Sequence, residues 1–241
     1  MPTKTMKSKN LIIIILLSIQ FCFGQKNSAY IEYGVKIYDD NGSFTKDKMF
    51  ADTFLNAVKE ANKLTFGLII SDKGSKFYEV NNGIEQNYEI GLAKIYANYM
   101  GIIYNIENDI IKESQLLGNN IFTKENKIEN WILTTETKII DSYICFKATN
   151  TYTVINPKGT FKYPVTAWYC PKLPYSYGPN GYGNLPGLIL ELQVRNVNFG
   201  IKKITLESDL QFNLEFLKTA KILTEEELNK KLDEFNNFEG K

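Results

Sequence analysis

The sequence predicts an α+β domain, mainly of antiparallel strands, in which a curved sheet or half-barrel packs with one to three helices, including a C-terminal helix. Three observations indicate this class. Aromatic residues make up 13% of the 241 residues, and Ile, Thr and Tyr are plentiful, which favours strands over helices. Short segments with apolar residues near every second position recur along the chain between turns rich in Gly and Asn. Clear helical periodicity is confined to residues 47–64 and the C-terminal end.

The N-terminus has the features of an export signal, residues 1–24. Three lysines precede a run of about a dozen apolar residues, which is shorter than the roughly 20 that a spanning helix needs. Cleavage between Gly24 and Gln25 leaves one domain, residues 25–241. Lipidation at Cys22 and a retained membrane anchor are the alternatives. We expect a periplasmic, secreted or cell-surface protein that has no integral membrane segment once the signal is cleaved.

Composition excludes several classes of site. Removing the signal takes three of the 28 basic residues and leaves 25 against 27 acidic ones, so no basic excess attracts nucleic acid. The chain contains no histidine, which excludes Ser-His-Asp and Cys-His catalysis and every zinc site that uses His. Two cysteines outside the signal do not make a four-thiolate metal site. We therefore expect no catalytic residues, no metal and no cofactor. Hydrolysis by paired carboxylates, such as Glu191 or Asp141, stays open although no spacing points to a pair.

The first part of the domain reads as strand, helix and then meander. Residues 30–38 and 64–71 alternate as strands, and an Asp-Lys-Gly turn joins the second of them to a strand over residues 76–80. Between them, residues 47–64 carry an apolar stripe at helical spacing that includes Phe50 and Phe54.

Residues 81–127 give a weaker signal. Residues 90–99 fit either a short helix or a strand, because Tyr and Ile serve in both. Three short segments with turns of Asn and Gly between them read as strands, at residues 102–106, 111–117 and 120–124.

A long hairpin follows a strand at residues 131–135. Its arms are residues 143–152 and 160–169, and the turn Asn-Pro-Lys-Gly at 156–159 has the Pro and Gly positions of a type I turn. If Asn156 pairs with Gly159, the numbers of paired residues add up to 315, as those of Cys145 and Cys170 do. These cysteines then face each other on adjacent strands, either as a disulfide, which an export context permits, or as two buried free thiols.

The chain ends with two more strands and a helix. Residues 188–194 alternate and pair with residues 200–208 through a four-residue turn. Thr224 and Glu227 form a capping box that starts a C-terminal helix, whose apolar stripe we expect to dock on the sheet (Leu228, Leu232 and Phe235).

Between the hairpin and these strands lies a proline- and glycine-rich loop. Residues 167–191 hold four prolines, four glycines and five aromatic residues. Because proline fixes φ and glycine permits positive φ, the loop has a defined shape. Gly187, directly after Pro186, is expected in a turn conformation that a side chain would not tolerate. No Lys-Ser or Lys-Thr follows these glycines, so they do not form a phosphate-binding loop.

The same residues carry a family resemblance. Residues 184–189 (NLPGLI), preceded by AWY at 167–169 and by a Gly-Pro pair, resemble the signature of the GLPGLI family of exported Bacteroidetes proteins. Cys170 stands where that family has Thr. Asn184 replaces its first Gly, a mild change because Asn tolerates the left-handed region. The resemblance extends more weakly over residues 131–192. It implies export and supplies no activity and no catalytic residue.

Three hypotheses of function follow. In the first, a non-enzymatic exported protein binds a lipid, a peptide or an envelope protein through the curved sheet and the aromatic loop, with a shape analogous to the half-barrel of lipoprotein carriers. In the second, the protein is a structural subunit of an outer-membrane assembly, and in the third it is a carboxylate-dependent hydrolase. The candidate binding residues lie in or beside the loop: Trp168, Tyr175, Tyr177, Tyr182, Asn184, Pro186 and Gly187. Trp168 is expected to pack in the core, whereas the three tyrosines are open to either packing or contact.

Overall fold

The computed structural model describes residues 28–40, 42, 44–114, 120–156, 159–224, 226–228 and 230–231. Four sequence predictions lie outside these residues. They are the export signal, the end of the strand expected at 111–117, the Pro157–Lys158 turn and the later part of the C-terminal helix with Leu232 and Phe235.

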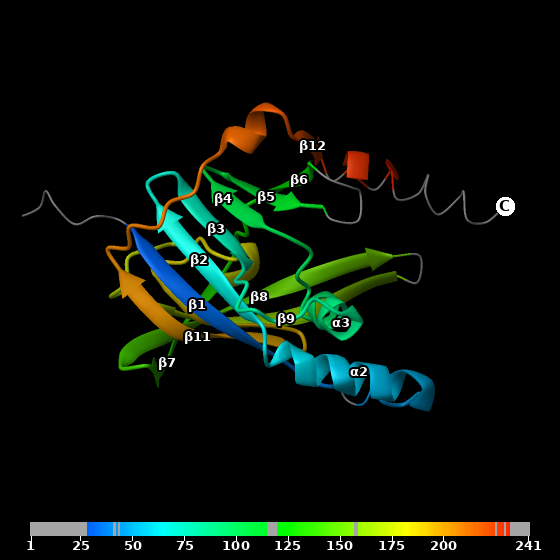
Figure 1. The fold of residues 1–241 in the computed structure, drawn as a ribbon. Coiled ribbons are helices and arrows are strands. Elements are labelled where there is room, and N and C mark those ends of the chain that lie inside the picture. The colour runs from blue at the N-terminus through cyan, green and yellow to red at the C-terminus, as the bar shows by residue number, and fades with distance from the viewer. Residues whose placement is uncertain are drawn as a thin grey trace, which may run out of the picture.

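In the described part of the chain, one curled sheet holds twelve strands in the order β12-β6-β5-β4-β3-β2-β1-β11-β10-β9-β8-β7 (Figure 1). All neighbouring strands are antiparallel except β12 and β6, which are parallel. This confirms the predicted fold class. The strands before the long hairpin are β1 (Ala29–Ile37), β2 (Thr65–Ser71), β3 (Gly74–Glu79), β4 (Ile103–Ile106), β5 (Asp109–Glu113), β6 (Ile121–Asn126) and β7 (Ile132–Ile140). The others are β8 (Tyr143–Asn156), β9 (Gly159–Cys170), β10 (Leu188–Val194), β11 (Val197–Leu206) and β12 (Lys221–Thr224).

Two helices pack on the core. Helix α2 (Lys48–Ala61) begins after Asp47, whose carboxylate accepts a hydrogen bond from the Met49 N–H at 2.9 Å. It buries Phe54 and two alanines one and two turns further on. Phe50, predicted on the same stripe, is instead 55% exposed, because the first turn of α2 extends away from the strands (Figure 1).

The ambiguous segment at residues 90–99 is a helix. Helix α3 (Tyr88–Tyr96) starts where the Asn87 side chain accepts a hydrogen bond from the Ile90 N–H at 2.9 Å. It buries Ile90 and Ala93 and packs against α2. The burial of these two residues at helical spacing, with the polar cap before them, resolves a pattern that alternation alone left open.

Apolar residues fill both faces of the strands before β7. The main core, on one face, joins the helices to rings such as Tyr33, Phe66 and Phe199. On the other face a smaller cluster around Tyr104 is covered by residues 208–220, which include the short 3-10 helix η4 (Glu215–Lys218). Every residue of β2 is therefore buried, as is usual for a strand covered on both faces.

Several boundaries differ from the predicted ones. Strand β7 reaches Ile140, well past the predicted end at Thr135. Strand β11 begins at Val197, because a two-residue turn with Arg195 at φ 52° replaces the predicted four-residue one. At the C-terminus, the predicted capping box is confirmed, since Glu227 accepts a hydrogen bond from the Thr224 N–H at 2.8 Å and donates its own N–H to the Thr224 hydroxyl at 3.3 Å.

Candidate functional site

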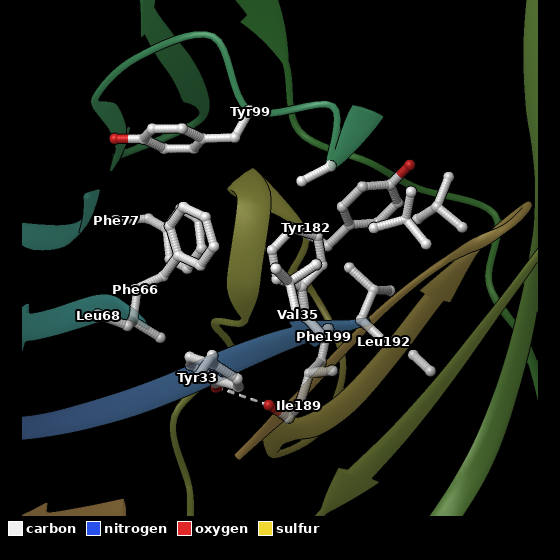
Figure 2. Close-up of a cluster of buried hydrophobic side chains, with 14 of the residues drawn as sticks. Tyr33, Val35, Phe66, Leu68, Phe77, Tyr99, Tyr182, Ile189, Leu192 and Phe199 are labelled. Atoms are coloured by element: carbon white, nitrogen blue, oxygen red, sulfur yellow. Dashed lines mark hydrogen bonds between the residues drawn. The ribbon is translucent and has the colours of Figure 1, made fainter. Parts of the chain in front are cut away.

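The proline- and glycine-rich loop, residues 171–187, is hydrogen-bonded to the strand that follows it. The Leu188 N–H donates to the Leu173 carbonyl at 2.9 Å, and the Ile189 N–H donates to the Tyr177 carbonyl at 3.0 Å. Opposite, the Tyr33 hydroxyl donates to the Ile189 carbonyl at 2.7 Å (Figure 2). The loop is thus built into the sheet rather than projecting from it.

Gly187 closes this arrangement. Its φ is 152°, and a Cβ at this position would lie 2.2 Å from the Cys170 carbonyl oxygen. Only glycine lets the backbone after Pro186 come this close to the end of β9. The structure therefore agrees with the turn conformation expected from the sequence.

The middle of the loop enters the core. The 3-10 helix η3 (Pro179–Gly181) is fully buried, and Tyr182 after it is only 9% exposed. Figure 2 shows Tyr182 within the same buried cluster as Tyr33 and Phe199. The Trp131 indole N–H donates to the Gly183 carbonyl at 3.0 Å, and its ring meets that of Tyr182 edge-on. Burial raises the pKa of the Tyr182 hydroxyl far above its ordinary value. Of the two roles that the sequence left open for Tyr182, packing and contact with a partner, the structure shows packing.

Asn180, at the centre of η3, has one polar atom without a partner. Its backbone is left-handed, with φ 53°, and its amide nitrogen donates to the Asn98 carbonyl at 3.2 Å. Its amide oxygen is buried and accepts no hydrogen bond from any residue that the structure describes. An unsatisfied buried acceptor costs about 1–3 kcal/mol.

Trp168 lies on the other face of the sheet from its neighbours Ala167 and Tyr169, which are buried. The tryptophan is half-buried against the main core, and the Lys138 ammonium lies 4.4 Å from its ring centroid. The same ammonium pairs with a Glu191 carboxylate oxygen at 2.8 Å. Trp168 therefore packs, as expected, but on the outer face and beneath a lysine rather than within the main core.

Three of the predicted loop residues come together at the surface. Tyr175, Tyr177 and Asn184 line a shallow pocket of about 330 Å³. Lys127 completes it, with its ammonium 5.9 Å from the Tyr177 ring centroid, and burial lowers the pKa of this lysine. Pro186 is exposed and lies outside this pocket.

Two further hollows are lined mainly by strands of the sheet. The first, the chamber, has a volume of about 340 Å³ and is lined mainly by rings and aliphatic side chains, namely those of Phe44, Tyr96, Tyr163, Phe199, Val154 and Val194. The second, the cleft, measures about 700 Å³ and lies between residues 123–126 of β6 and residues 150–153 of β8. Asn98, Tyr152 and Asn180 line both hollows, so the two are neighbours.

Four charged residues that line these hollows are in ion pairs: Arg195 at the chamber, and Lys112, Lys124 and Glu125 at the cleft. At the chamber, Arg195 Nε lies 2.8 Å from an Asp40 carboxylate oxygen, and the guanidinium carbon lies 4.3 Å from the Tyr163 ring centroid. At the cleft, Lys112 pairs with Glu125 at 2.6 Å. The surroundings thus suit an uncharged ligand.

Sequence reasoning missed both hollows. Their lining comes from seven strands (β4, β5, β6, β8, β9, β10 and β11), from α3, from the segments before α2 and after α3, and from Leu228 near the C-terminus. No local motif connects these segments. The predicted loop contributes only Asn180, Gly181 and Tyr182. The proposed hydrolase carboxylates are not brought together at a hollow either: Glu191 is paired on the outer face, and Asp141 lies in the turn between β7 and β8.

The register of the long hairpin is as predicted. Asn156 pairs with Gly159, and the ladder runs without a shift to Phe146 and Tyr169. Cys145 and Cys170, next along it, are both buried and present as free thiols. Burial and the neighbouring Cys170 raise the pKa of the Cys145 thiol to about 12. A disulfide between them stays a prediction.

Neither a membrane-spanning helix nor a cluster of metal ligands occurs among the described residues. No described helix is long and apolar enough to cross a membrane. Nowhere in the described ranges do three or more His, Cys, Asp or Glu side chains gather as metal ligands.

Comparison with known proteins gives a short family match. A family model described as a protein of unknown function (Porph_ging) matches residues 156–191, which run from the hairpin turn to the start of β10 and include the NLPGLI hexapeptide. No curated protein matches the sequence. Because the family match covers less than half of the chain, the GLPGLI family name stays a prediction.

Comparison with solved structures gives distant matches. PNGF-II in a P21 crystal matches 84% of this chain, with a TM-score of 0.48, 16% identity and 31% of its own length covered. PNGF-II in a C2 crystal matches 86% of this chain, with a TM-score of 0.48, 16% identity and 32% of its length covered. LprF from Mycobacterium bovis matches 86% of this chain over 97% of its own length, with a TM-score of 0.29 and 9% identity. The chain thus spans less than a third of the PNGF-II chains, and these scores carry no functional argument.

Proposed function

We propose that the protein is an exported, non-enzymatic binding protein that holds a lipid or peptide ligand in the chamber and cleft of its curved sheet. The observation that carries the proposal is the meeting of the two hollows at Asn180, whose buried amide oxygen has no partner among the described residues. A pocket that is mostly apolar, with a few polar groups at defined places, is the usual form of a ligand site.

The lining specifies the ligand in outline. The chamber offers aromatic and aliphatic walls, which favour an apolar group by removing its surface from water at about 25 cal/mol per Å². Asn98 and Asn180 line both hollows, so a ligand that combines apolar and polar groups suits the junction. Because the Arg195 guanidinium is already paired with the Asp40 carboxylate, it does not need an anionic ligand group as a partner.

A chamber-filling variant tests the proposal. Val154 is half-buried and lines the chamber, and Val154→Trp would occupy that space. Ile139→Trp, at a position that is 74% exposed on β7, is the matched control because it adds the same ring away from both hollows. The probe is Nile red, a neutral apolar fluorophore, and native mass spectrometry detects ligands that copurify with the full chain.

We expect one saturable Nile red site in the wild type, weakened at least tenfold by Val154→Trp and unchanged by Ile139→Trp. Two results together would overturn the proposal: equal binding by all three proteins, and native spectra that show no adduct on the wild type.

A second candidate function, a subunit of an envelope assembly, is favoured by the outer strand β7. This strand is at the end of the sheet and exposes Ile132, Leu133 and Ile139 at 66%, 53% and 74%. Exposed apolar residues on an edge strand are typical of contact surfaces. Photo-crosslinking from position 139 in the envelope of a producing cell tests it. A discrete crosslinked partner supports a subunit role, and background labelling alone rejects it.

A further inference from the structure

The outer edge of β8 loses its partner strand halfway along. Strand β7 begins at Ile132, which pairs with Thr149 of β8. Beyond Thr149, β8 continues to Asn156 and pairs with β9 on one side alone within the described part of the chain. The far half of β8 is thus a third open edge of the sheet, in addition to its two end strands.

The backbone groups on this edge can be assigned from the neighbouring ladder. The Pro164 carbonyl accepts a hydrogen bond from the Arg195 N–H at 3.1 Å, so Pro164 faces β10. Its partner on β8 is Thr151, which therefore forms no ladder hydrogen bonds with β9. By alternation, the backbone groups of Thr151 and Thr153 both point away from β9.

One of these groups is already capped. The Thr151 N–H donates to the Asn150 side-chain oxygen at 2.7 Å. The Thr151 carbonyl and both backbone groups of Thr153 have no hydrogen-bond partner among the described residues. They form the acceptor, donor and acceptor pattern that an added strand requires.

This edge lies in the cleft. Residues 150–153 form one wall, and residues 123–126 of β6 form the opposite wall. Strand β12 ends at Thr224, opposite Lys124, so among the described residues no strand pairs with the last two residues of β6 on that side. Leu228, which follows β12, also lines the cleft. A strand added to β8 would therefore lie beside the cleft residues of β6.

The edge lacks the features that protect open strands. Natural edges are shielded by short length, charge, proline or bulges. Strand β12 has four residues, and β7 has an irregular register between Leu133 and Thr137, with Glu136 beside it. Residues 150–154 of β8 read NTYTV, without charge, proline or bulge.

The charges of the cleft select the occupant. Lys112 is paired with Glu125, and Lys124 with Asp109, each at 2.6 Å. The Glu113 carboxylate accepts a hydrogen bond from the Ile102 N–H at 3.2 Å. With these charges engaged, the cleft favours an uncharged chain that supplies backbone donors and acceptors. At about 3.3 Å per residue, four residues of β8 match a guest segment of similar length.

From these observations we infer that the cleft binds an extended, uncharged peptide segment of a partner protein as an added strand on the open edge of β8. The inference rests on the proposed binding function and names its ligand class. The chamber next to the cleft, reached past Tyr152 and Asn180, holds one apolar side chain of the guest.

The test removes one backbone donor. Thr153→Pro deletes the outward N–H of Thr153, and because that N–H does not bond to β9, the hairpin ladder stays intact. Thr153→Val keeps the N–H and is the matched control. The probes are peptides selected on the full chain from a displayed library of neutral eight-residue sequences. Binding of the selected peptides is measured by calorimetry.

We expect selected peptides to bind the wild type and Thr153→Val alike and to bind Thr153→Pro at least about fivefold more weakly, the effect of one lost hydrogen bond. Hydrogen exchange at the Thr153 amide should slow in the complex. Equal binding by Thr153→Pro would overturn the inference, as would a dimer of this chain that Thr153→Pro dissociates, since a second copy would then be the occupant.

The two proposals fail in different ways. If the library yields no peptide while Val154→Trp still weakens Nile red binding, the peptide inference fails and the binding function stands. If neither the library nor Nile red binds, both fail.

Discussion

Replacing Gly187 by alanine tests whether the NLPGLI hexapeptide is a folding element. Gly187 follows the exposed Pro186 and has a φ of 152°, and the Cβ of an alanine here would lie 2.2 Å from the Cys170 carbonyl oxygen and 2.8 Å from the Pro171 nitrogen. Both contacts are with backbone atoms, which do not rotate out of the way as a side chain does. The end of β9 or the start of β10 must move to admit a single methyl group.

The cost follows from two effects. An alanine in this part of φ/ψ space is strained by about 1–3 kcal/mol. Forcing a methyl group into a packed site costs about 1–3 kcal/mol more. The sum, about 4 kcal/mol, is a large part of the 5–15 kcal/mol that usually stabilises a domain. At about 2–4 °C per kcal/mol for a chain of this size, Gly187→Ala should lower the melting temperature by roughly 8–16 °C.

Gly91→Ala is the matched control. A Cβ at Gly91, in helix α3, meets nothing within 4 Å. Because alanine is a better helix former than glycine, this variant should be more stable by up to about 1 kcal/mol. Urea unfolding followed by tryptophan fluorescence compares the three proteins. If Gly187→Ala unfolds at the same urea concentration as the wild type, the steric reasoning is wrong.

Three further outcomes are expected. Tyr33→Phe removes the hydrogen bond to the Ile189 carbonyl and should lower the free energy of unfolding by about 1–3 kcal/mol at neutral pH. Burial raises the pKa of Tyr33 well above its ordinary value, so above about pH 10 the tyrosine ionises in the unfolded chain before it does in the folded one. The stability difference between the wild type and Tyr33→Phe should therefore shrink as the pH rises above about 10, which pH-dependent melting will show. Asn180→Ala should be less stable than Asn180→Gly by about 1 kcal/mol, since glycine tolerates φ 53° and alanine does not, and equal urea midpoints would contradict this. Thiol titration of the denatured, unreduced protein will show whether Cys145 and Cys170 are bonded: two free thiols in protein from an oxidising compartment would reject the disulfide, and their absence would support it.

The hairpin was predictable because one short turn determines its whole ladder. Once Asn156 and Gly159 were paired, every residue from Phe146 to Tyr169 followed in register. The same logic failed at β7, whose end was placed at Thr135, because charged and apolar residues mix along an edge strand that is exposed over most of its length.

Residues 90–99 show why a short apolar segment is ambiguous. The pattern of Ile and Tyr fits a strand and a helix equally, and the deciding contact, α3 against α2, joins segments about thirty residues apart along the chain. The chamber, too, is formed by segments that lie far apart along the chain. Its walls meet only when the sheet curls, so neither composition nor spacing predicts them.

The loop has a defined shape, as predicted, but more of it is buried than the prediction of a surface for contact implied. Prolines and glycines indicate that a backbone conformation is defined, but they do not indicate which surface it faces. In the structure, η3 and Tyr182 fill the inside of the sheet, and only Tyr175, Tyr177 and Asn184 gather at a surface pocket. Tyr182 lies between two glycines, which have no side chains, so its large ring can insert into a core as readily as it can contact a partner.

The NLPGLI hexapeptide therefore has a structural role, apart from the residues that line the proposed binding cleft. The hexapeptide closes the loop over the end of β9, where Gly187 has no room for a side chain, and η3 supplies the base of both hollows. Residues such as Gly187 are constrained by the backbone conformation, whereas most cleft residues of β6 and β8 are exposed or half-buried and so less constrained by packing. Proteins that share the motif are therefore expected to share the curved sheet and its base while differing in what they bind. Under the proposed binding function, residues 123–126 and 150–153, outside the hexapeptide motif, are where ligand specificity is expected.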